Sequence, residues 1–307
     1  MSKKDLSRRD FIKTSLSIGA VTFGSQFWNN PLFAADDNVI PDIIAVRNGE
    51  PDIMYHRAME ALGGMKNFIK KGQTVLVKPN IAWARTPEEG ANTNPLLVKT
   101  IVHDILQAGA DKVYVFDHTC NDPEKCYAMS NIEEAAKEAG AIVVPGGNES
   151  DYVPVKIPGG KILKDAKIHK MLAESDVMIN VPVLKHHKSA KMTAAMKNLM
   201  GVVWNRSYYH RKGLHQCIAD FCTYAKPTLN IVDGYRVTMD NGPQRAKPED
   251  IVLRKMLLVS KDMVAVDAAV SKILNYEPDK VEHIRYGHEM NIGNMNLAEQ
   301  NIKKIII

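Results

Sequence analysis

One stretch of this 307-residue chain lacks acidic residues altogether. From Val177 through Ala219 there is no Asp or Glu, although the overall acid content of the chain would place roughly five there. The same window holds seven Lys and Arg residues and four His residues. Its lysines alternate with Ala and Met rather than with stacking aromatic residues, which argues against a nucleic-acid surface. Two interpretations remain, a solvated basic face and a pocket for a small anion.

Long apolar runs are also missing. After the N-terminal region no run approaches the roughly 18 apolar residues that span a bilayer, so no membrane span is expected in the mature chain. The segment SRRDFIK at 7–13 matches the twin-arginine export pattern, and small residues suited to cleavage follow near Ala34 and Ala35. Residues 1–35 are therefore predicted to be a signal peptide that directs the protein to the periplasm. Their removal lowers the formal net charge from +5 to near +2, so the basic window is a local feature.

Recognised cofactor motifs are absent as well. The chain has no G-x-G-x-x-G, no G-x-x-x-x-G-K-[ST] and no H-E-x-x-H. A nucleotide cofactor of the usual kind is therefore not indicated, and no compact spacing of metal ligands stands out. The cofactor stays unknown, with a metal ion or an iron–sulfur cluster as the alternatives.

No Ser/Gly linker or fixed-period repeat divides the mature chain, so residues 36–307 are interpreted as a single α/β domain, with room for a small appended lobe. Continuous apolar runs predict strands buried on both faces. These runs lie at 43–46, 74–77, 112–116, 141–144, 177–183 and 229–232. Helical patterns between them, such as the one from Pro95 to Ala110, predict a mostly parallel, doubly wound sheet. The segment 152–163 is expected to form a hairpin or a meander, and 263–274 a packed helix.

Polar residues follow these apolar runs. In open α/β sheets the ligand crevice lies beyond the carboxyl ends of the strands, so these side chains are expected to converge there. Lys78, Asn80, Asn198 and His187 are predicted to bind the ligand, and Lys185 and Lys197 to take part in catalysis.

Further groups could serve catalysis or hold a metal ion. His215, with Asp220 nearby, could act as a general base or a metal ligand. Asp117 and Asp233 follow strand runs and could bind a metal ion or orient other groups, whereas Asp267 lies inside a helical pattern and is expected to cap a helix or to pair with a lysine.

Lys197 is singled out within the window. The segment TAAMKNLMG is interpreted as a helix with Thr193, Met196, Lys197 and Met200 on one face. A lysine beside apolar neighbours and near Lys185 should have a lowered pKa, because desolvation and like charge both disfavour its ammonium form.

Four cysteines leave several alternatives open. Cys120 and Cys126 could form a disulfide, as expected first in an exported protein. Cys217 and Cys222 would lie about 140° apart around a helix axis and could not easily bond to each other. A metal or iron–sulfur site built from both pairs is the alternative, although the spacing is not that of a ferredoxin. Free thiols are the third possibility.

Several blocks together resemble the domain of unknown function 362 family. They are VLVKPNI, DHTC, LKHHKSAKMTAAMKNLMGVV, LHQCIAD, LNIVDG, NGP and MVAVDAA, in that order. The resemblance covers essentially the whole mature chain, and it implies an α/β fold and the location of a site. Many relatives carry ferredoxin-like cysteine motifs or a twin-arginine leader, and this chain has only the leader.

A second resemblance is to the nickel-dependent lactate racemase family. In that family the cofactor-bearing lysine lies in a Gly-Gly-x-Lys stretch followed by Pro-Gly. Lys197 is placed similarly, with His187 upstream and Gly201 downstream, but Ala194 and Ala195 stand where the glycines would be.

The sequence therefore predicts an exported α/β protein whose basic crevice binds a small anionic molecule, with an enzyme as the leading interpretation. One alternative is a non-catalytic iron–sulfur or metal-handling protein that works with a redox partner protein. The other is a metal-dependent racemase or epimerase of hydroxy acids. No nucleic-acid partner is expected.

Overall fold

The computed structural model describes residues 27–28 and 39–307. Except for residues 27 and 28, the predicted signal peptide lies outside the described residues. No helix within the described ranges is both long and apolar enough to cross a membrane.

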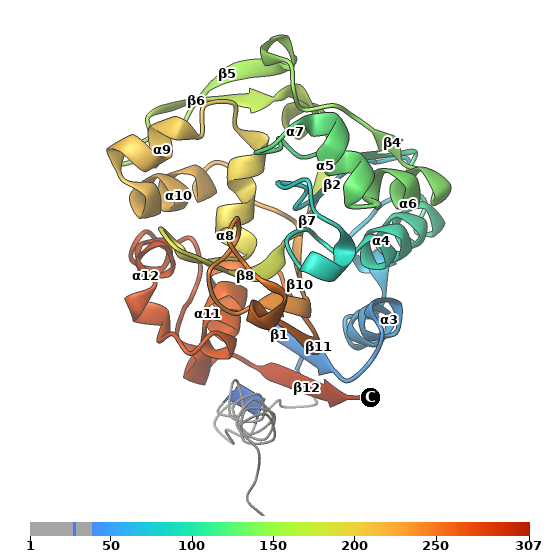
Figure 1. Cartoon of the computed structure of the whole chain (residues 1–307). Coiled ribbons are helices and arrows are strands. Elements are labelled where there is room, and N and C mark those ends of the chain that lie inside the picture. The colour runs from blue at the N-terminus through green and yellow to red at the C-terminus, as the bar shows by residue number, and fades with distance from the viewer. Residues whose placement is uncertain (1–26, 29–38) are drawn as a thin grey trace, which may run out of the picture.

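A single large sheet forms the centre of the described chain (Figure 1). Its strands lie in the order β12 (Ile302–Ile306), β1 (Ile43–Arg47), β11 (Ile251–Ser260), β10 (Leu229–Thr238), β7 (Val177–Val181), β2 (Thr74–Pro79), β3 (Lys112–Val115) and β4 (Ile142–Val143). Off this path, β8 (Val183–His187) pairs with β10 and with β9 (Lys191–Thr193). Strand pairs β12–β1, β10–β7, β7–β2, β2–β3 and β3–β4 are parallel, which confirms the mostly parallel α/β class.

Strand β11 runs antiparallel to both of its neighbours, β1 and β10, and β9 runs antiparallel to β8. Neither β11 nor β12 was among the strands predicted from the sequence. Two adjacent charged residues, Arg254 and Lys255, interrupt the apolar residues of β11, so the strand does not stand out as one continuous apolar run.

Helices cover both faces of the sheet. One face is covered by α3 (Pro51–Ala61), α4 (Pro95–Gln107), α5 (Pro123–Met129) and α6 (Ile132–Glu138). The other face is covered by α8 (Ala195–Asn198), α9 (Ser207–Lys212), α10 (Leu214–Cys222), α11 (Met263–Ile273) and α12 (Glu282–Glu289), which lie to the left in Figure 1. Helix α7 (Lys170–Glu174) follows the hairpin described below.

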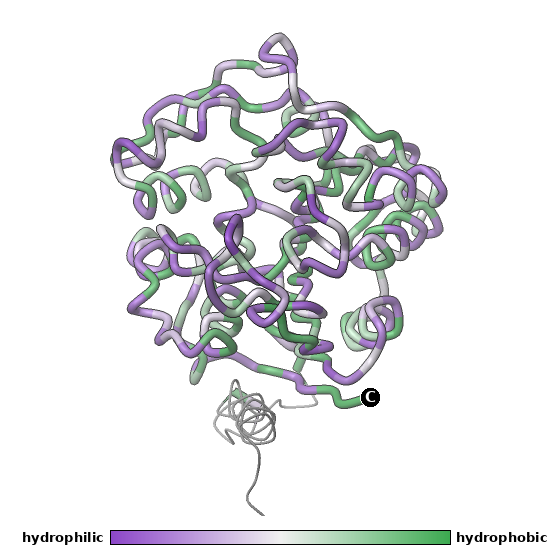
Figure 2. Tube along the Cα trace, viewed as in Figure 1, coloured by the Kyte–Doolittle hydropathy of each residue, from purple (hydrophilic) through white to green (hydrophobic). Residues whose placement is uncertain are grey.

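The core therefore has two parts, one on each face. Along β1, Ile43 and Ala45 pack into one cluster, whereas Ile44 and Val46 pack into the other. Because successive side chains of a strand point to opposite faces, a strand buried on both sides must be apolar throughout. Helix α4 buries one side only, with Leu97, Val98, Ile101, Val102 and Ile105, whereas α11 is buried almost all round. Figure 2 shows hydrophilic and hydrophobic residues succeeding one another along the helices that flank the sheet.

The predicted hairpin forms a separate two-stranded antiparallel sheet, β5 (Tyr152–Lys156) and β6 (Asp165–His169), at the top of Figure 1.

The segment around Lys197, predicted to be one helix, is divided among three short elements in the structure. Thr193 ends β9, α8 makes a single turn, and a 3-10 helix (Leu199–Val202) continues from it. The expected helix face that includes Thr193 was therefore wrong, because the antiparallel pairing of Thr193 with Lys185 keeps that residue in a strand.

Candidate functional site

A cavity of about 940 Å³ lies beyond the carboxyl end of β2, where β8, α8 and the chain after β3 meet. Its lining includes eight of the eleven predicted site and metal residues: Lys78, Asn80, Asp117, Cys120, Lys185, His187, Lys197 and Asn198. The lining contains six cationic side chains, Lys78, Lys185, Lys188, Lys197, Arg206 and Arg245, against two carboxylates, Asp117 and Asp240. The acid-free window thus contributes most of the charge to one concave surface.

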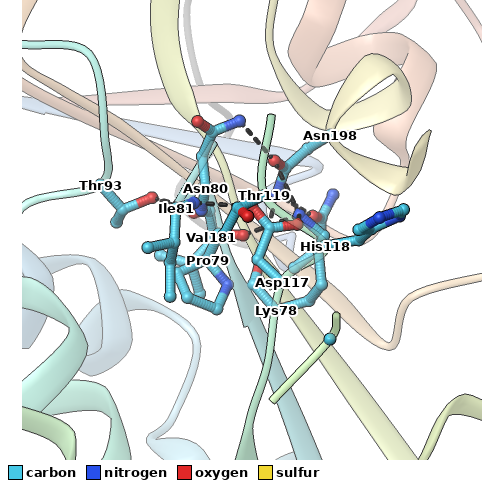
Figure 3. Close-up of polar contacts among 12 residues, drawn as sticks. Lys78, Pro79, Asn80, Ile81, Thr93, Asp117, His118, Thr119, Val181 and Asn198 are labelled. Atoms are coloured by element: carbon cyan, nitrogen blue, oxygen red, sulfur yellow. Dashed lines mark hydrogen bonds and ion pairs between the residues drawn. The ribbon is translucent and has the colours of Figure 1, made fainter. Parts of the chain in front are cut away.

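Two residues of the cavity lining, Lys78 and Asp117, form a buried ion pair (Figure 3). Lys78 Nζ lies 2.7 Å from Asp117 Oδ1, and the two side chains are 0% and 2% exposed. The other carboxylate oxygen of Asp117 accepts a hydrogen bond of 2.6 Å from the amide of Ile81. Burial lowers the pKa of Lys78, and the carboxylate of Asp117 opposes that shift.

Gly201 allows the segment after α8 to lie directly against the ion pair. A Cβ atom at this position would overlap Asp117 Oδ1 and would lie 2.6 Å from Lys78 Nζ. The carbonyl of Gly201 accepts a hydrogen bond from the amide of His118, which joins this segment to the chain after β3. Only glycine leaves room for that approach.

Buried asparagines connect the lysines. Asn80 donates from Nδ2 to Asn198 Oδ1 (2.9 Å) and accepts at Oδ1 from Lys185 Nζ (2.9 Å). Asn198 also accepts from Lys78 Nζ at 3.1 Å and donates to Asn180 Oδ1 at 2.9 Å. Asn180 in turn donates to Asn230 Oδ1. The side-chain amides of Asn80 and Asn198 therefore position lysines as well as lining the cavity.

Lys185 and Lys197 have environments that favour the neutral amine. Burial lowers the pKa of Lys185 to about 7, and the nearby charge of Lys197 adds to the effect. Burial likewise lowers the pKa of Lys197 to about 8, with Arg206 and Lys78 acting in the same direction and Cys120 and Asp117 opposing. The pKa of Lys197 is therefore shifted in the direction that its sequence context predicted.

His187 also lines the cavity as a neutral side chain. Its Nδ1 accepts a hydrogen bond of 3.1 Å from the amide of Ala190, so the ring proton resides on Nε2. Burial lowers the pKa of His187 to about 2, and Lys197 and Lys185 lower it further. The imidazole can therefore donate one hydrogen bond without carrying a charge.

Arg206 fixes the loop after β3. Its guanidinium donates to the carbonyls of His118 (2.7 Å) and Thr119 and contacts Cys120 Sγ at 3.3 Å. Arg206, Asn180 and Asn230 were not among the residues predicted from the sequence. The available signal was an asparagine inside an otherwise apolar strand run, VMINVPV and LNIV, because a buried amide must find partners.

Three predicted residues lie outside the cavity lining. Asp233 is buried in β10 and accepts from the amides of Asn94 and Tyr235, so it holds the beginning of α4. Cys126 is buried, with its thiol 3.7 Å from the carbonyl of Ala82.

His215 contacts His283 and Glu282 rather than the cavity. Asp220, expected to assist His215, instead accepts from the amides of Ile162 and Leu163 in the hairpin loop. His215 and Asp220 thus contact different remote segments, so they do not act together as the sequence had suggested.

The predicted metal ligands do not gather. Throughout the described ranges, no three His, Cys, Asp or Glu side chains lie close enough together to hold a metal ion. All four cysteines are free thiols, and Cys120 is the exposed one.

Asp267 acts as a cap, as its sequence context suggested. From α11 it accepts hydrogen bonds of 2.6 Å and 3.0 Å from the amides of Ala195 and Met196 at the beginning of α8. Burial raises the pKa of Asp267 to about 7, while both of these hydrogen bonds lower it. The helix that carries Lys197 is thereby tied to a second element.

Comparisons with known proteins connect the chain to one family and to several individual proteins. The model of the family described as "Domain of unknown function (DUF362)" matches residues 75–272. A thylakoid-associated protein of Synechocystis sp. is 28% identical over 234 residues, which cover 72% of this chain and 68% of that protein.

Two solved structures are also similar. The lactate racemase apoprotein from Thermoanaerobacterium thermosaccharolyticum is 16% identical, with a TM-score of 0.48 over 75% of this chain and 57% of that chain. A protein from Thermotoga maritima is 10% identical, with a TM-score of 0.47 over 74% of this chain and 59% of that chain. The matched region thus spans less than two thirds of either solved chain.

Proposed function

This chain belongs to the DUF362 family, and from that premise we propose that its basic cavity binds a small anion, a carboxylate or a phosphate, as an enzyme would bind its substrate. The observation that carries the proposal is that the side chain of Lys197 lacks a partner in the described part of the protein. Its ammonium lines the cavity, and among the described residues no hydrogen-bond acceptor or carboxylate is paired with it. Lys78 in the same cavity has such a carboxylate, at 2.7 Å.

Electrostatics support this proposal. An unpaired cation that is partly removed from water is costly, and an anionic ligand would supply the missing partner. Of the two carboxylates in the lining, Asp117 is already engaged by Lys78, and Asp240 is exposed. The cavity therefore keeps an excess of positive charge that favours an anion.

Export through the twin-arginine pathway to the periplasm is part of the proposal. It depends on the SRRDFIK segment at 7–13 alone, because that segment lies outside the described residues.

Isothermal titration calorimetry of the purified chain with phosphate, lactate and malonate tests anion binding. Lys197→Met should weaken binding of the preferred anion about 10- to 100-fold, since a hydrogen bond to a charged group contributes roughly 1.5–3 kcal/mol. Lys212→Met is the matched control, because Lys212 is exposed, lies in the same acid-free window and is not part of the lining. Equal affinity in the parent and Lys197→Met, or no heat with any of the three anions, would contradict the proposal.

A further inference from the structure

The three buried or partly buried lysines of the cavity differ in how many hydrogen-bond acceptors the protein gives them. Lys78 Nζ has three: Asp117 Oδ1 at 2.7 Å, the carbonyl of Pro79 at 2.7 Å and Asn198 Oδ1 at 3.1 Å. An ammonium group has three N–H donors, so this lysine is saturated as a cation. Lys78 is therefore part of the framework of the cavity and has no donor left for a ligand.

Lys185 Nζ has two acceptors, Asn80 Oδ1 at 2.9 Å and the carbonyl of Ala91. Two acceptors match the two N–H donors of a neutral primary amine, which then keeps one free lone pair. The pKa of about 7 that results mainly from burial is consistent with a neutral amine in a large share of molecules near neutral pH. Lys185 can therefore take up and return a proton.

Lys197 Nζ has no acceptor among the described residues, although the backbone that carries it is fixed. Asp267 caps the first turn of α8, and the next residue, Asn198, is bonded to Lys78 and Asn180. A rigid backbone thus presents a primary amine to the cavity without a protein partner. A pKa of about 8, lowered chiefly by burial, leaves a substantial fraction of this amine neutral and nucleophilic.

We propose that Lys197 forms an imine with the carbonyl carbon of a small 2-oxo carboxylate, with Lys185 relaying the protons. This inference rests on the proposed function, because the cationic lining and the neutral Nε2–H donor of His187 hold the carboxylate of the same ligand. It narrows the ligand class from any small anion to an anion with an adjacent ketone or aldehyde. The three lysines then have different roles, which follow from the number of hydrogen-bond acceptors around each: Lys78 is structural, Lys185 transfers protons and Lys197 reacts with the ligand.

The step balances without a further reactant. The lone pair of Nζ attacks the carbonyl carbon, a C–N bond forms, and the C=O π bond breaks to give a carbinolamine. The two hydrogens of the neutral Nζ leave as protons. The neutral amine of Lys185 accepts each proton on its lone pair and passes it to the former carbonyl oxygen. That oxygen leaves as water, and a C=N bond remains. No electron is gained or lost, so no oxidant or reductant takes part.

Reductive trapping tests the imine directly. The purified full chain is incubated with pyruvate and sodium cyanoborohydride, and the modified residue is located by peptide mass spectrometry. We expect one stable adduct on the peptide that contains Lys197, formed at least tenfold faster than any adduct on exposed Lys212. The trapping rate should rise with pH up to about the pKa of Lys197, near 8. Adduct formation spread evenly over the surface lysines would overturn the imine.

Lactate and the variant Lys197→Arg separate this inference from the proposed function. Lactate has the carboxylate of pyruvate but a hydroxyl in place of its ketone, so it should bind and protect Lys197 from trapping. Lys197→Arg keeps the positive charge and lacks the amine. It should lose the adduct, and a urea unfolding midpoint equal to that of the parent shows that the variant folds. Lactate binding by the parent without any Lys197 adduct from pyruvate would overturn the imine and leave anion binding intact.

Discussion

The Lys78–Asp117 pair should make the largest single contribution to stability within the cavity, and Lys78→Met tests this. The substitution keeps most of the side-chain volume and leaves Asp117 as a buried carboxylate without its cation. Removing one member of a buried pair costs about 3–5 kcal/mol. For a chain of this size, that corresponds to a lowering of Tm by roughly 6–20 °C. Loss of the donor to Asn198 Oδ1 acts in the same direction.

Urea unfolding followed by circular dichroism measures this loss as a lower midpoint with an unchanged slope. The double variant Lys78→Met with Asp117→Leu removes both charges, so it should be less destabilised than the sum of the two single variants by at least about 1 kcal/mol. Lys156→Met is the matched control, because its ion pair with Asp165 has side chains that are 83% and 62% exposed. That control should not change the midpoint measurably. A Lys78→Met midpoint equal to that of the control, or strict additivity in the cycle, would refute the reasoning.

Two further predictions concern acid stability and export. His283 is fully buried, and its pKa is held well below the ordinary value by burial, with His215 adding to the effect. Because the unfolded chain takes up a proton that the folded chain does not, the free energy of unfolding should fall by about 1 kcal/mol between pH 7.5 and 5.5 on account of this residue. His283→Leu should flatten the pH dependence of the urea midpoint by that amount, and an identical dependence in the parent and the variant would count against a neutral buried His283. Changing Arg8 and Arg9 together to Lys should leave the precursor in the cytoplasm, and an undiminished amount of periplasmic mature protein on immunoblots of cell fractions would disprove the export assignment.

The sequence by itself determined the parallel core of the fold and the end of the sheet at which the basic cavity lies. Apolar runs at 43–46, 74–77 and 177–183 became β1, β2 and the β7–β8 segment because burial on both faces requires continuous hydrophobicity. Polar residues that follow such runs, Lys78 and Lys185 among them, then meet at the carboxyl ends of the strands. These properties depend on local composition, which the sequence contains in full.

Strand direction and partner choice were decided only by tertiary structure. Nothing in the run at 251–260 distinguishes an antiparallel strand from a parallel one, and β11 is antiparallel because it pairs with both β1 and β10. Asp117 and Asp233 follow their strand runs in the same way, yet Asp117 neutralises Lys78 whereas Asp233 holds the start of α4.

The roles of the lysines depend on the same long-range contacts. Lys78 receives an acceptor from Asn198, 120 positions away, and Lys185 receives one from Asn80, 105 positions away. Lys197 receives none within the described part of the chain. Charge and residue type are fixed by the sequence, but the number of acceptors around an amine, and so its protonation and reactivity, is set by segments that only folding brings together.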